Sequence, residues 1–311
     1  MKKILGVFLL TLVLVSFVGC NNNKEAKAEN SKLKIVATTT MLRDLVLEIG
    51  KDKVDVEGLM GYGIDPHLYK ASAGDVDKMS KADIIIYNGL HLEGKMAEIF
   101  ESMENLNKKV LAVGDIIPKE ELIKVESDTK SYDPHIWFDV SLWIKASKYV
   151  EEILVESDYD NKDFYEENAK LYIEELEKLD EYIVNQIKEL DKNKRVLITA
   201  HDAFSYFGKK YNFEVRGLQG LSTVSEAGTL DVKNLADYIS DNKIPAIFVE
   251  SSVSPKNIEA LKDAVSSRNY NVEIGGELYS DSLGDEKSGH ETYIKTFKHN
   301  VDTIVNALNK D

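Results

Sequence analysis

A long amphipathic segment in the middle of the chain constrains the fold most. From residue 163 to residue 190, apolar side chains recur at spacings of three and four, and no glycine or proline interrupts them. This spacing predicts one continuous helix with a single apolar face, about 42 Å long. A coiled coil would need a second segment of this kind, which the chain lacks. We therefore expect a rigid helix that lies against the two halves of the chain it separates and limits hinge motion between them.

Segments rich in β-branched residues alternate with helical patterns on both sides of this helix. In the first half we expect strands over 34–40, 54–60, 83–89 and 108–114, and helices over 41–49, 72–81 and 94–104. In the second half we expect strands over 195–200, 213–219, 246–252 and 271–277, and helices over 203–210, 231–242, 255–267 and 291–309. Such alternation is typical of a mostly parallel sheet covered by helices.

The predicted fold is therefore α/β, with two similar lobes that are joined by one long rigid helix. Each lobe contains a mostly parallel four-stranded sheet with flanking helices. We place the N-terminal lobe at 33–162, the linking helix at 163–190 and the C-terminal lobe at 191–311. Ser72 and Asp75 have the spacing of a capping box at the start of one helix, with Asp in place of the usual Glu.

The first residues have the pattern of a targeting signal. Lys2 and Lys3 precede an uncharged apolar run over 4–18, which is too short for an untilted membrane span but fits a secretory signal peptide. The run ends at Gly19-Cys20, which resembles a bacterial lipoprotein signal. We therefore predict a signal peptide over 1–19, acylation of Cys20, a flexible tether over 20–32, and a protein anchored at the outer face of the bacterial cytoplasmic membrane.

Composition excludes several kinds of site and partner. The chain has 311 residues and only one cysteine, so it cannot form an internal disulfide framework or a cysteine-based zinc site. Its formal net charge of −15 argues against nucleic acid as a partner, because binding nucleic acid requires clustered Lys and Arg. Beyond residue 20, no stretch is long and apolar enough to span a membrane.

The tripeptide Asp-Pro-His occurs twice and contains two of the six histidines, one in each copy. Asp65-Pro66-His67 and Asp133-Pro134-His135 each present a histidine from a stiff turn, since proline fixes its own φ angle. In each copy we expect the aspartate to accept the second imidazole N–H, which would fix the tautomer of a metal ligand.

Two further candidate ligands follow predicted strands of the second half. His201 comes directly after the strand ending at Ala200, and Asp281 lies just beyond the strand over 271–277. His67 also follows a predicted strand. Ligands of open α/β sheets bind outside the carboxyl ends of the strands. Three imidazoles and one carboxylate suit Zn²⁺, Mn²⁺ or Fe²⁺, and their division between the halves predicts a metal ion in the cleft between the lobes.

Several segments together resemble one protein family, the TroA-like metal-receptor lipoproteins of manganese and zinc ABC importers. The resemblance runs from about Ile35 to the C-terminus and rests on the motifs GLMGYGIDPHLYKAS, NGLHLE, DPHIWFD, LITAHDAFSYF, AIFVESS and GGELYSD. It implies a cluster A-I solute-binding protein that binds one Mn²⁺ or Zn²⁺ ion per chain, as cargo, and delivers it to an ABC permease and its ATPase. The family's ligand positions fall on His67, His135, His201 and Asp281. We also expect a monomer.

The sequence leaves the identity of the metal open. Many manganese receptors of this family carry Glu at the third position, whereas this chain carries His201, a softer donor that favours zinc. Zinc-dedicated relatives typically carry a His-rich acidic loop in the first lobe, but the corresponding stretch over 119–132 has no histidine. Zinc binds more tightly than manganese at almost any such site, so affinity alone does not identify the cargo.

Two other function classes remain as alternatives. A secreted metallohydrolase could use a three-histidine zinc with Asp281 or Asp202 as base, and an adhesin role has been assigned to members of the family. We expect His91, His290 and His299 to have structural or surface roles, and Trp137 and Trp143 to pack in the core of a lobe. The chain contains no P-loop, HExxH, GxSxG or EF-hand motif.

Overall fold

The computed structural model describes residues 32–125 and 128–310. Residues Leu33–Asp311 cluster into one compact unit. The predicted signal peptide, Cys20 and the tether up to residue 31 lie outside the described residues. Within the described part of the chain, no helix is long and apolar enough to cross a membrane.

The first lobe contains a four-stranded parallel sheet in the order β2-β1-β3-β4. Its strands are β1 (Leu33–Ala37), β2 (Val54–Gly58), β3 (Ile84–Tyr87) and β4 (Lys109–Ala112). Successive side chains of a strand point to opposite faces. In β1, Ile35 and Ala37 accordingly belong to one hydrophobic core and Val36 to another. Both faces of this sheet are therefore covered, as expected for parallel strands.

The second lobe contains two parallel strand pairs, β7 with β8 and β9 with β10. These strands are β7 (Val196–His201), β8 (Glu214–Gln219), β9 (Ala246–Glu250) and β10 (Glu273–Leu278). β7 and β9 lie next to each other, so the strands follow the order β8-β7-β9-β10. Each of the eight strands predicted from the sequence overlaps one of these, and the α/β prediction is confirmed.

Nine α-helices lie in the described residues. They are α1 (Thr40–Gly50), α2 (Ala73–Lys81), α3 (Ala97–Asn105), α4 (Val140–Ser157), α5 (Lys162–Lys188), α6 (Ser205–Tyr211), α7 (Thr229–Asn242), α8 (Lys256–Ser266) and α9 (Tyr293–Leu308). Helix α4 was not predicted from the sequence. A short antiparallel hairpin of β5 (Lys124–Val125) and β6 (Asp128–Tyr132) was not predicted either.

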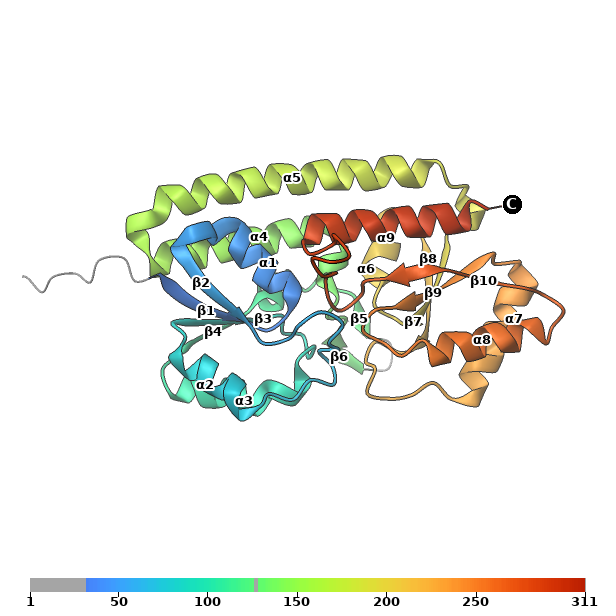
Figure 1. The fold of residues 1–311 in the computed structure, drawn as a ribbon, viewed down its shortest axis with the longest axis horizontal. Coiled ribbons are helices and arrows are strands. Elements are labelled where there is room, and N and C mark those ends of the chain that lie inside the picture. Colours follow the sequence, from blue (N-terminus) through green and yellow to red (C-terminus); the bar gives the residue numbers. More distant parts are fainter. Residues whose placement is uncertain (1–31, 126–127, 311) are drawn as a thin grey trace, which may run out of the picture. The chain divides into compact units, whose positions relative to one another are not determined.

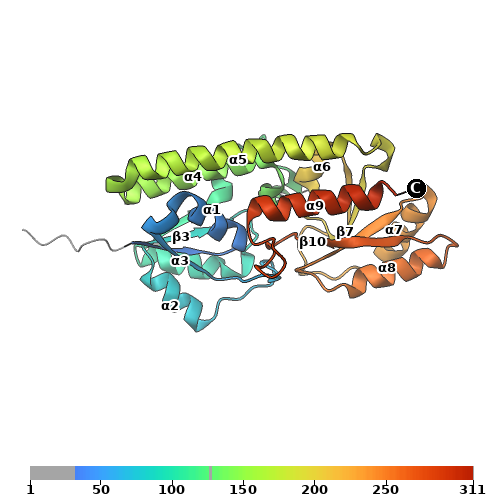
Figure 2. The same cartoon turned by 45° about the horizontal axis from the view of Figure 1, so that its top comes forward.

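The long helix α5 spans 27 residues and packs on both lobes. It contacts α1 and α4 of the first lobe and α9 of the second, and it runs along these helices in Figures 1 and 2. The apolar side chains of the predicted stripe are all buried in the same core: Tyr165, Ala169, Tyr172, Leu176, Leu179, Ile183, Ile187 and, just beyond the helix, Leu190. Since that core also contains Ile35 of β1 and Phe248 of β9, the two sheets share one hydrophobic layer beneath α5.

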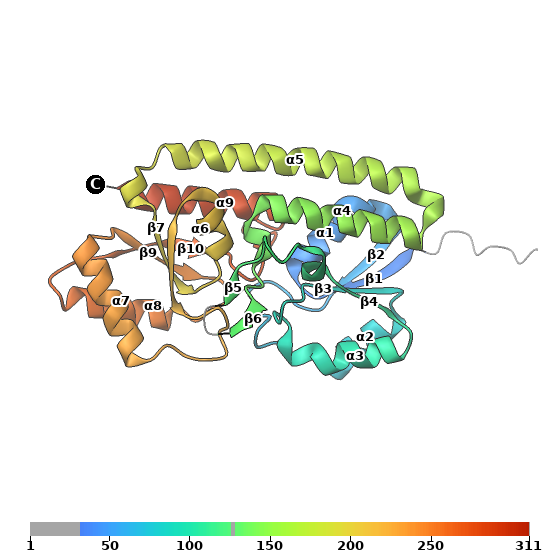
Figure 3. The same ribbon diagram turned by 180° about the vertical axis from the view of Figure 1, so that it is seen from behind.

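Helix α4 supplies one of the two tryptophans of that layer. Trp143 is fully buried and stacks on Tyr293 of α9, with ring centroids 5.2 Å apart. The prediction that Trp143 packs in the core is confirmed, and the contact joins the two lobes. On the other faces of the sheets, α2 and α3 cover the first lobe, and α7 and α8 cover the second (Figure 3).

The predicted capping box is present at the start of α2. The Ser72 hydroxyl accepts the Asp75 backbone N–H at 3.2 Å, and the Asp75 carboxylate accepts the Ser72 backbone N–H at 2.8 Å. We expect Ser72→Ala to lower the free energy of unfolding by about 1 kcal/mol, as loss of such a cap usually does. Chemical denaturation would measure this. Ser80→Ala, at a half-buried position of the same helix where the hydroxyl donates only to the Asp77 backbone oxygen, should change the free energy of unfolding by less than half as much.

Candidate metal site

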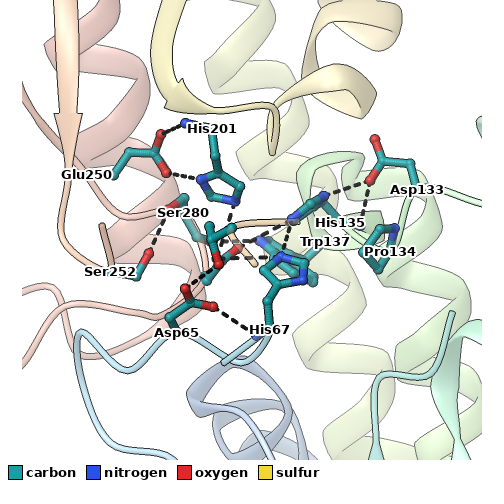
Figure 4. Close-up of polar contacts among 12 residues, drawn as sticks. Asp65, His67, Asp133, Pro134, His135, Trp137, His201, Glu250, Ser252 and Ser280 are labelled. Carbon is teal, nitrogen blue, oxygen red and sulfur yellow. Dashed lines mark hydrogen bonds and ion pairs between the residues drawn. The ribbon is translucent and has the colours of Figure 1, made fainter. Parts of the chain in front are cut away.

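Buried side chains converge between the lobes, and Figure 4 shows three of them, His67, His135 and His201, pointing toward one another. His67, His135, His201 and Asp281 each offer one ligand atom, and these atoms all lie within 4.8 Å of one another. The structure therefore brings together all four residues selected from the sequence. No other group of three or more such residues in the described ranges meets the same criterion.

The fold positions each of the four at the cleft edge of a sheet or in a loop beside it. His201 ends β7, and Asp281 lies three residues beyond β10. His67 lies in the loop between β2 and α2, and His135 lies between β6 and a short 3₁₀ helix over Ile136–Phe138. Because the strands of each sheet are parallel, their carboxyl ends meet on the same side, which places these loops opposite each other.

The distances between the donor atoms match a tetrahedral site. His67 Nε2 lies 3.4 Å from His135 Nε2, and the Asp281 oxygens lie 3.5 Å from His135 Nε2 and 3.3 Å from His201 Nε2. The fourth separation, between His67 Nε2 and Asp281 Oδ2, is 3.9 Å. Ligands bound at about 2.0–2.1 Å around a tetrahedral ion lie about 3.3–3.4 Å apart, so three of these four separations are close to those around such an ion.

Three of the atoms that face this centre have no hydrogen-bond partner. Both oxygens of Asp281 and Nε2 of His201 are buried and make no hydrogen bond that meets geometric criteria. Buried polar atoms are normally satisfied, and a cluster of unsatisfied ones marks a place for a ligand. Their convergence supports a bound cation, which would accept lone pairs from all of them.

Carboxylates behind two of the histidines fix which nitrogen faces the centre. Asp133 Oδ1 accepts His135 Nδ1–H at 2.7 Å, and Glu250 Oε2 accepts His201 Nδ1–H at 2.6 Å. Each carboxylate also accepts the backbone N–H of the same histidine. Such partners hold the neutral tautomer whose Nε2 lone pair points to the metal.

The predicted role of Asp133 is confirmed, but that of Asp65 is wrong. Asp65 Oδ1 accepts the backbone N–H of His67 at 2.8 Å rather than its ring. Its other oxygen accepts the hydroxyl of Thr223 from the second lobe, so no Asp65 oxygen is directed to the imidazole. The two Asp-Pro-His copies therefore share the backbone turn, and only the second also orients the ring.

Glu250 and Trp137 contribute to the site although the sequence analysis did not select them. Glu250 is the last residue of β9 and is 3% exposed. A glutamate that ends an apolar strand is a signal that could have identified it. Trp137 donates its Nε1–H to the backbone oxygen of Ser280 at 3.0 Å, and its ring lies edge-on to that of His135. It thereby holds the segment that carries Asp281 against the first lobe.

Burial and neighbouring charges alter the protonation of the metal-free site. Burial lowers the pKa of His67 to about 3. Burial also opposes the charged form of His135, but Asp133 and Asp281 outweigh it and raise the pKa of His135 to about 9. Burial likewise raises the pKa of Asp281, yet His201 and His135 outweigh it and hold the pKa well below its usual range. A metal ion that binds here must therefore displace a proton from His135.

The other three histidines lie outside the four-residue group. His91 is exposed and, with His67, lines a cavity of about 700 Å³ beside the cleft. His290 and His299 pack against each other with ring centroids 4.2 Å apart, and both contact the ring of Tyr279. These positions agree with the structural and surface roles expected for them.

Comparison with known proteins identifies the family. The family model described as "Zinc-uptake complex component A periplasmic" (ZnuA) matches residues 35–307. The chain is 44% identical to the zinc-binding protein TroA of Treponema pallidum over 99% of this chain and 98% of that protein. It is 43% identical to the manganese-binding lipoprotein MntA of Bacillus subtilis over 94% and 95% of the two chains.

The fold agrees with solved structures of the same group. The structure of the periplasmic zinc-binding protein TroA from Treponema pallidum matches with a TM-score of 0.88 at 46% identity, over 90% of this chain and all of that one. A manganese-bound periplasmic metal-binding protein from Candidatus Liberibacter asiaticus matches with a TM-score of 0.78 at 25% identity, over 89% of this chain and all of that one. The chain thus belongs to the ZnuA family of metal-binding components of ABC importers.

Proposed function

We propose that this protein captures one divalent transition-metal ion, Mn²⁺ or Zn²⁺, and delivers it to the permease of an ABC importer and its ATPase. The ligands are His67, His135, His201 and Asp281. The observation that carries the proposal is the convergence of three imidazole nitrogens and one carboxylate on a buried centre of tetrahedral dimensions.

This donor set favours a carrier over an enzyme. Four protein ligands complete the coordination of a tetrahedral ion, whereas catalytic zinc sites keep one position for water or substrate. The family to which the chain belongs consists of transport components. The three-histidine hydrolase considered from the sequence is therefore not retained.

The proposed location follows from the first twenty residues. Cys20, after the apolar run, would be acylated and hold the protein at the outer face of the cytoplasmic membrane. Relatives that align over nearly the whole chain are named lipoproteins, which supports this anchor.

The acidic charge of −15 supports the absence of nucleic acid among the partners. We further propose a monomer, with a lobe over 33–162, a linking helix over 163–190 and a second lobe over 191–311.

The donor set accommodates either ion. Three nitrogens and one oxygen suit both Zn²⁺ and Mn²⁺, and relatives of nearly equal identity are named for zinc in one case and manganese in the other. Because Zn²⁺ binds such donors more tightly than Mn²⁺ does, we propose that availability and the permease determine the cargo.

Metal competition on the metal-stripped protein, residues 21–311, tests this function. Zn²⁺ and Mn²⁺ would be offered separately and together, with bound metal determined by elemental mass spectrometry and thermal stability followed in parallel. We expect one ion of either metal per chain, a higher melting temperature in each case, and displacement of manganese by zinc. Zinc binding without detectable manganese binding would restrict the cargo to zinc. Binding of neither ion would overturn the proposed site.

A further inference from the structure

The loop that carries His67 is bonded to its own lobe at its ends, where Leu59 and Met60 donate to Ala37 and Thr38, but its middle has few such bonds. Residues 59–72 between β2 and α2 form no helix or strand. Within 61–68, the local backbone hydrogen bonds, Ile64 N–H to Gly61 and Leu68 N–H to Asp65, are long, at 3.4 and 3.3 Å. Tyr62, Ile64 and Leu68 are all more than 40% exposed. The buried position of His67 therefore requires support from elsewhere.

Two hydrogen bonds from the second lobe supply this support. The Thr223 hydroxyl donates to Asp65 Oδ2, and the other oxygen of Asp65 accepts the backbone N–H of His67 at 2.8 Å. The backbone N–H of Gly63 donates to the Ser282 hydroxyl at 2.9 Å. We call this pair the cross-cleft bonds. They connect the His67 loop to the loop after β8 and to the residue next to Asp281.

Thr223 and Ser282 are both buried, as expected for side chains that make these contacts. Thr223 is only 7% exposed, although Ser222 and Val224 on either side of it are exposed. Ser282 is 2% exposed. A single buried hydroxyl in an exposed loop is the arrangement expected when that hydroxyl docks on another surface.

The backbone of the His67 loop approaches the second lobe closely. Gly63 has a φ of +67°, in the left-handed region that favours glycine, and a Cβ at this position would lie 3.2 Å from the backbone oxygen of Ser251. The loop is thus packed against Ser251, the first residue after β9.

Elsewhere the lobes are joined through the shared core. Tyr293 of α9 donates its backbone N–H to Asp44 of α1 at 2.9 Å and stacks on Trp143. Separating the lobes as rigid bodies would disrupt this packed layer. Displacing the His67 loop would break the two cross-cleft bonds and the metal–His67 bond and would lift the Gly63 backbone from Ser251, but it would leave the shared core packed, so it is the smaller change.

From these contacts we infer that Thr223 and Ser282 are positioning residues that hold the His67 loop closed, and that movement of this loop is the step by which metal leaves. The inference rests on the proposed metal site and adds a route of release. Metal remains attached to His135, His201 and Asp281 until the loop opens, and those three ligands alone retain it weakly.

Release kinetics of the zinc-loaded protein test the inference. The protein, residues 21–311, would be loaded with Zn²⁺ and mixed with excess chelator, and zinc transfer followed by stopped flow. We expect Thr223→Val, which keeps the side-chain shape without the hydroxyl, to accelerate release about fivefold, in line with the loss of one hydrogen bond. Ser282→Ala should act similarly, and the double variant should release about 20-fold faster.

Two matched variants separate the hydroxyl from other effects. Thr223→Ser restores the donor and should release zinc near the wild-type rate. Ser222→Ala removes a neighbouring exposed hydroxyl, which accepts the Val224 backbone N–H within the same loop, and should also leave the rate unchanged. All variants should still bind one zinc per chain.

Two results would overturn the inference. In the first, Thr223→Val and the double variant release zinc at the wild-type rate. In the second, Thr223→Ser releases zinc as fast as Thr223→Val does. Failure of the wild-type protein to bind zinc would instead overturn the proposed function itself. The two failures are therefore distinguishable in the same experiment.

Discussion

Replacing Asp281 with alanine should lower the affinity for Zn²⁺ by more than about 100-fold. This loss exceeds the loss of affinity expected when a residue that only hydrogen-bonds to a metal ligand is removed. Asp281 is the only anionic ligand of the four, and its two oxygens lie within 3.5 Å of the Nε2 atoms of His135 and His201. Its loss leaves three neutral imidazoles and no carboxylate to offset the charge of the ion in a buried site. Competition with a chelator of known affinity would measure the change.

Asp202→Asn is the matched control for this experiment. Asp202 follows the ligand His201 and lines the cavity beside the cleft, but it is not one of the four converging residues. We expect its replacement to change zinc affinity by less than about tenfold. Equal losses in the two variants would show that general negative charge in the cleft, rather than coordination by Asp281, retains the ion. Circular dichroism would confirm that both variants are folded.

Replacing Glu250 with alanine should weaken zinc binding about 10- to 100-fold although Glu250 is not a ligand. Its carboxylate accepts both Nδ1–H and the backbone N–H of His201, at 2.6 and 2.8 Å. Without it, the ring can rotate and its Nδ1–H tautomer is no longer selected, so Nε2 is presented to the metal for only part of the time. Isothermal titration of the metal-stripped variant with Zn²⁺ would measure the loss.

An exposed glutamate provides the comparison for Glu250. Glu259 on α8 is exposed and is not one of the four converging residues, so Glu259→Ala should bind zinc as the wild type does. Unchanged affinity in Glu250→Ala would contradict the assigned role, because it would show that the position of His201 does not depend on this carboxylate. Asp133→Ala should weaken binding in the same range as Glu250→Ala, since Asp133 holds His135 in the same way.

Features that depend on local sequence were predicted well. The α5 helix was predicted over 163–190 and lies at Lys162–Lys188, because its apolar stripe is regular and lacks glycine and proline. The cap at Ser72 and the strands of both sheets follow from equally local signals. The four converging side chains could be selected because one tripeptide is repeated and two residues follow strands.

Helix α4 was missed although its signals are present. Asp139 caps it by accepting the Ser141 backbone N–H, and Trp143, Ala146 and Val150 recur at helical spacing on its buried side. The hairpin of β5 and β6 differs, because its residues are mostly polar and show no alternation that would indicate strands.

Contacts between distant segments could not be predicted from the sequence. Glu250 reaches His201 only because β7 and β9 lie side by side, and Thr223 reaches Asp65 only because the lobes face each other. The expectation that Asp65 orients the ring of His67 failed for this reason. A partner from the second lobe occupies one oxygen, and the local turn occupies the other.

One metal ion is proposed to lie between His67, His135, His201 and Asp281. The most direct test is a crystal structure of the zinc-loaded protein with data collected above and below the zinc absorption edge. We expect a single anomalous peak about 2.0–2.2 Å from the three Nε2 atoms and from an oxygen of Asp281. A peak that lacks any of these four ligands, or zinc bound instead at His290 and His299, would contradict it.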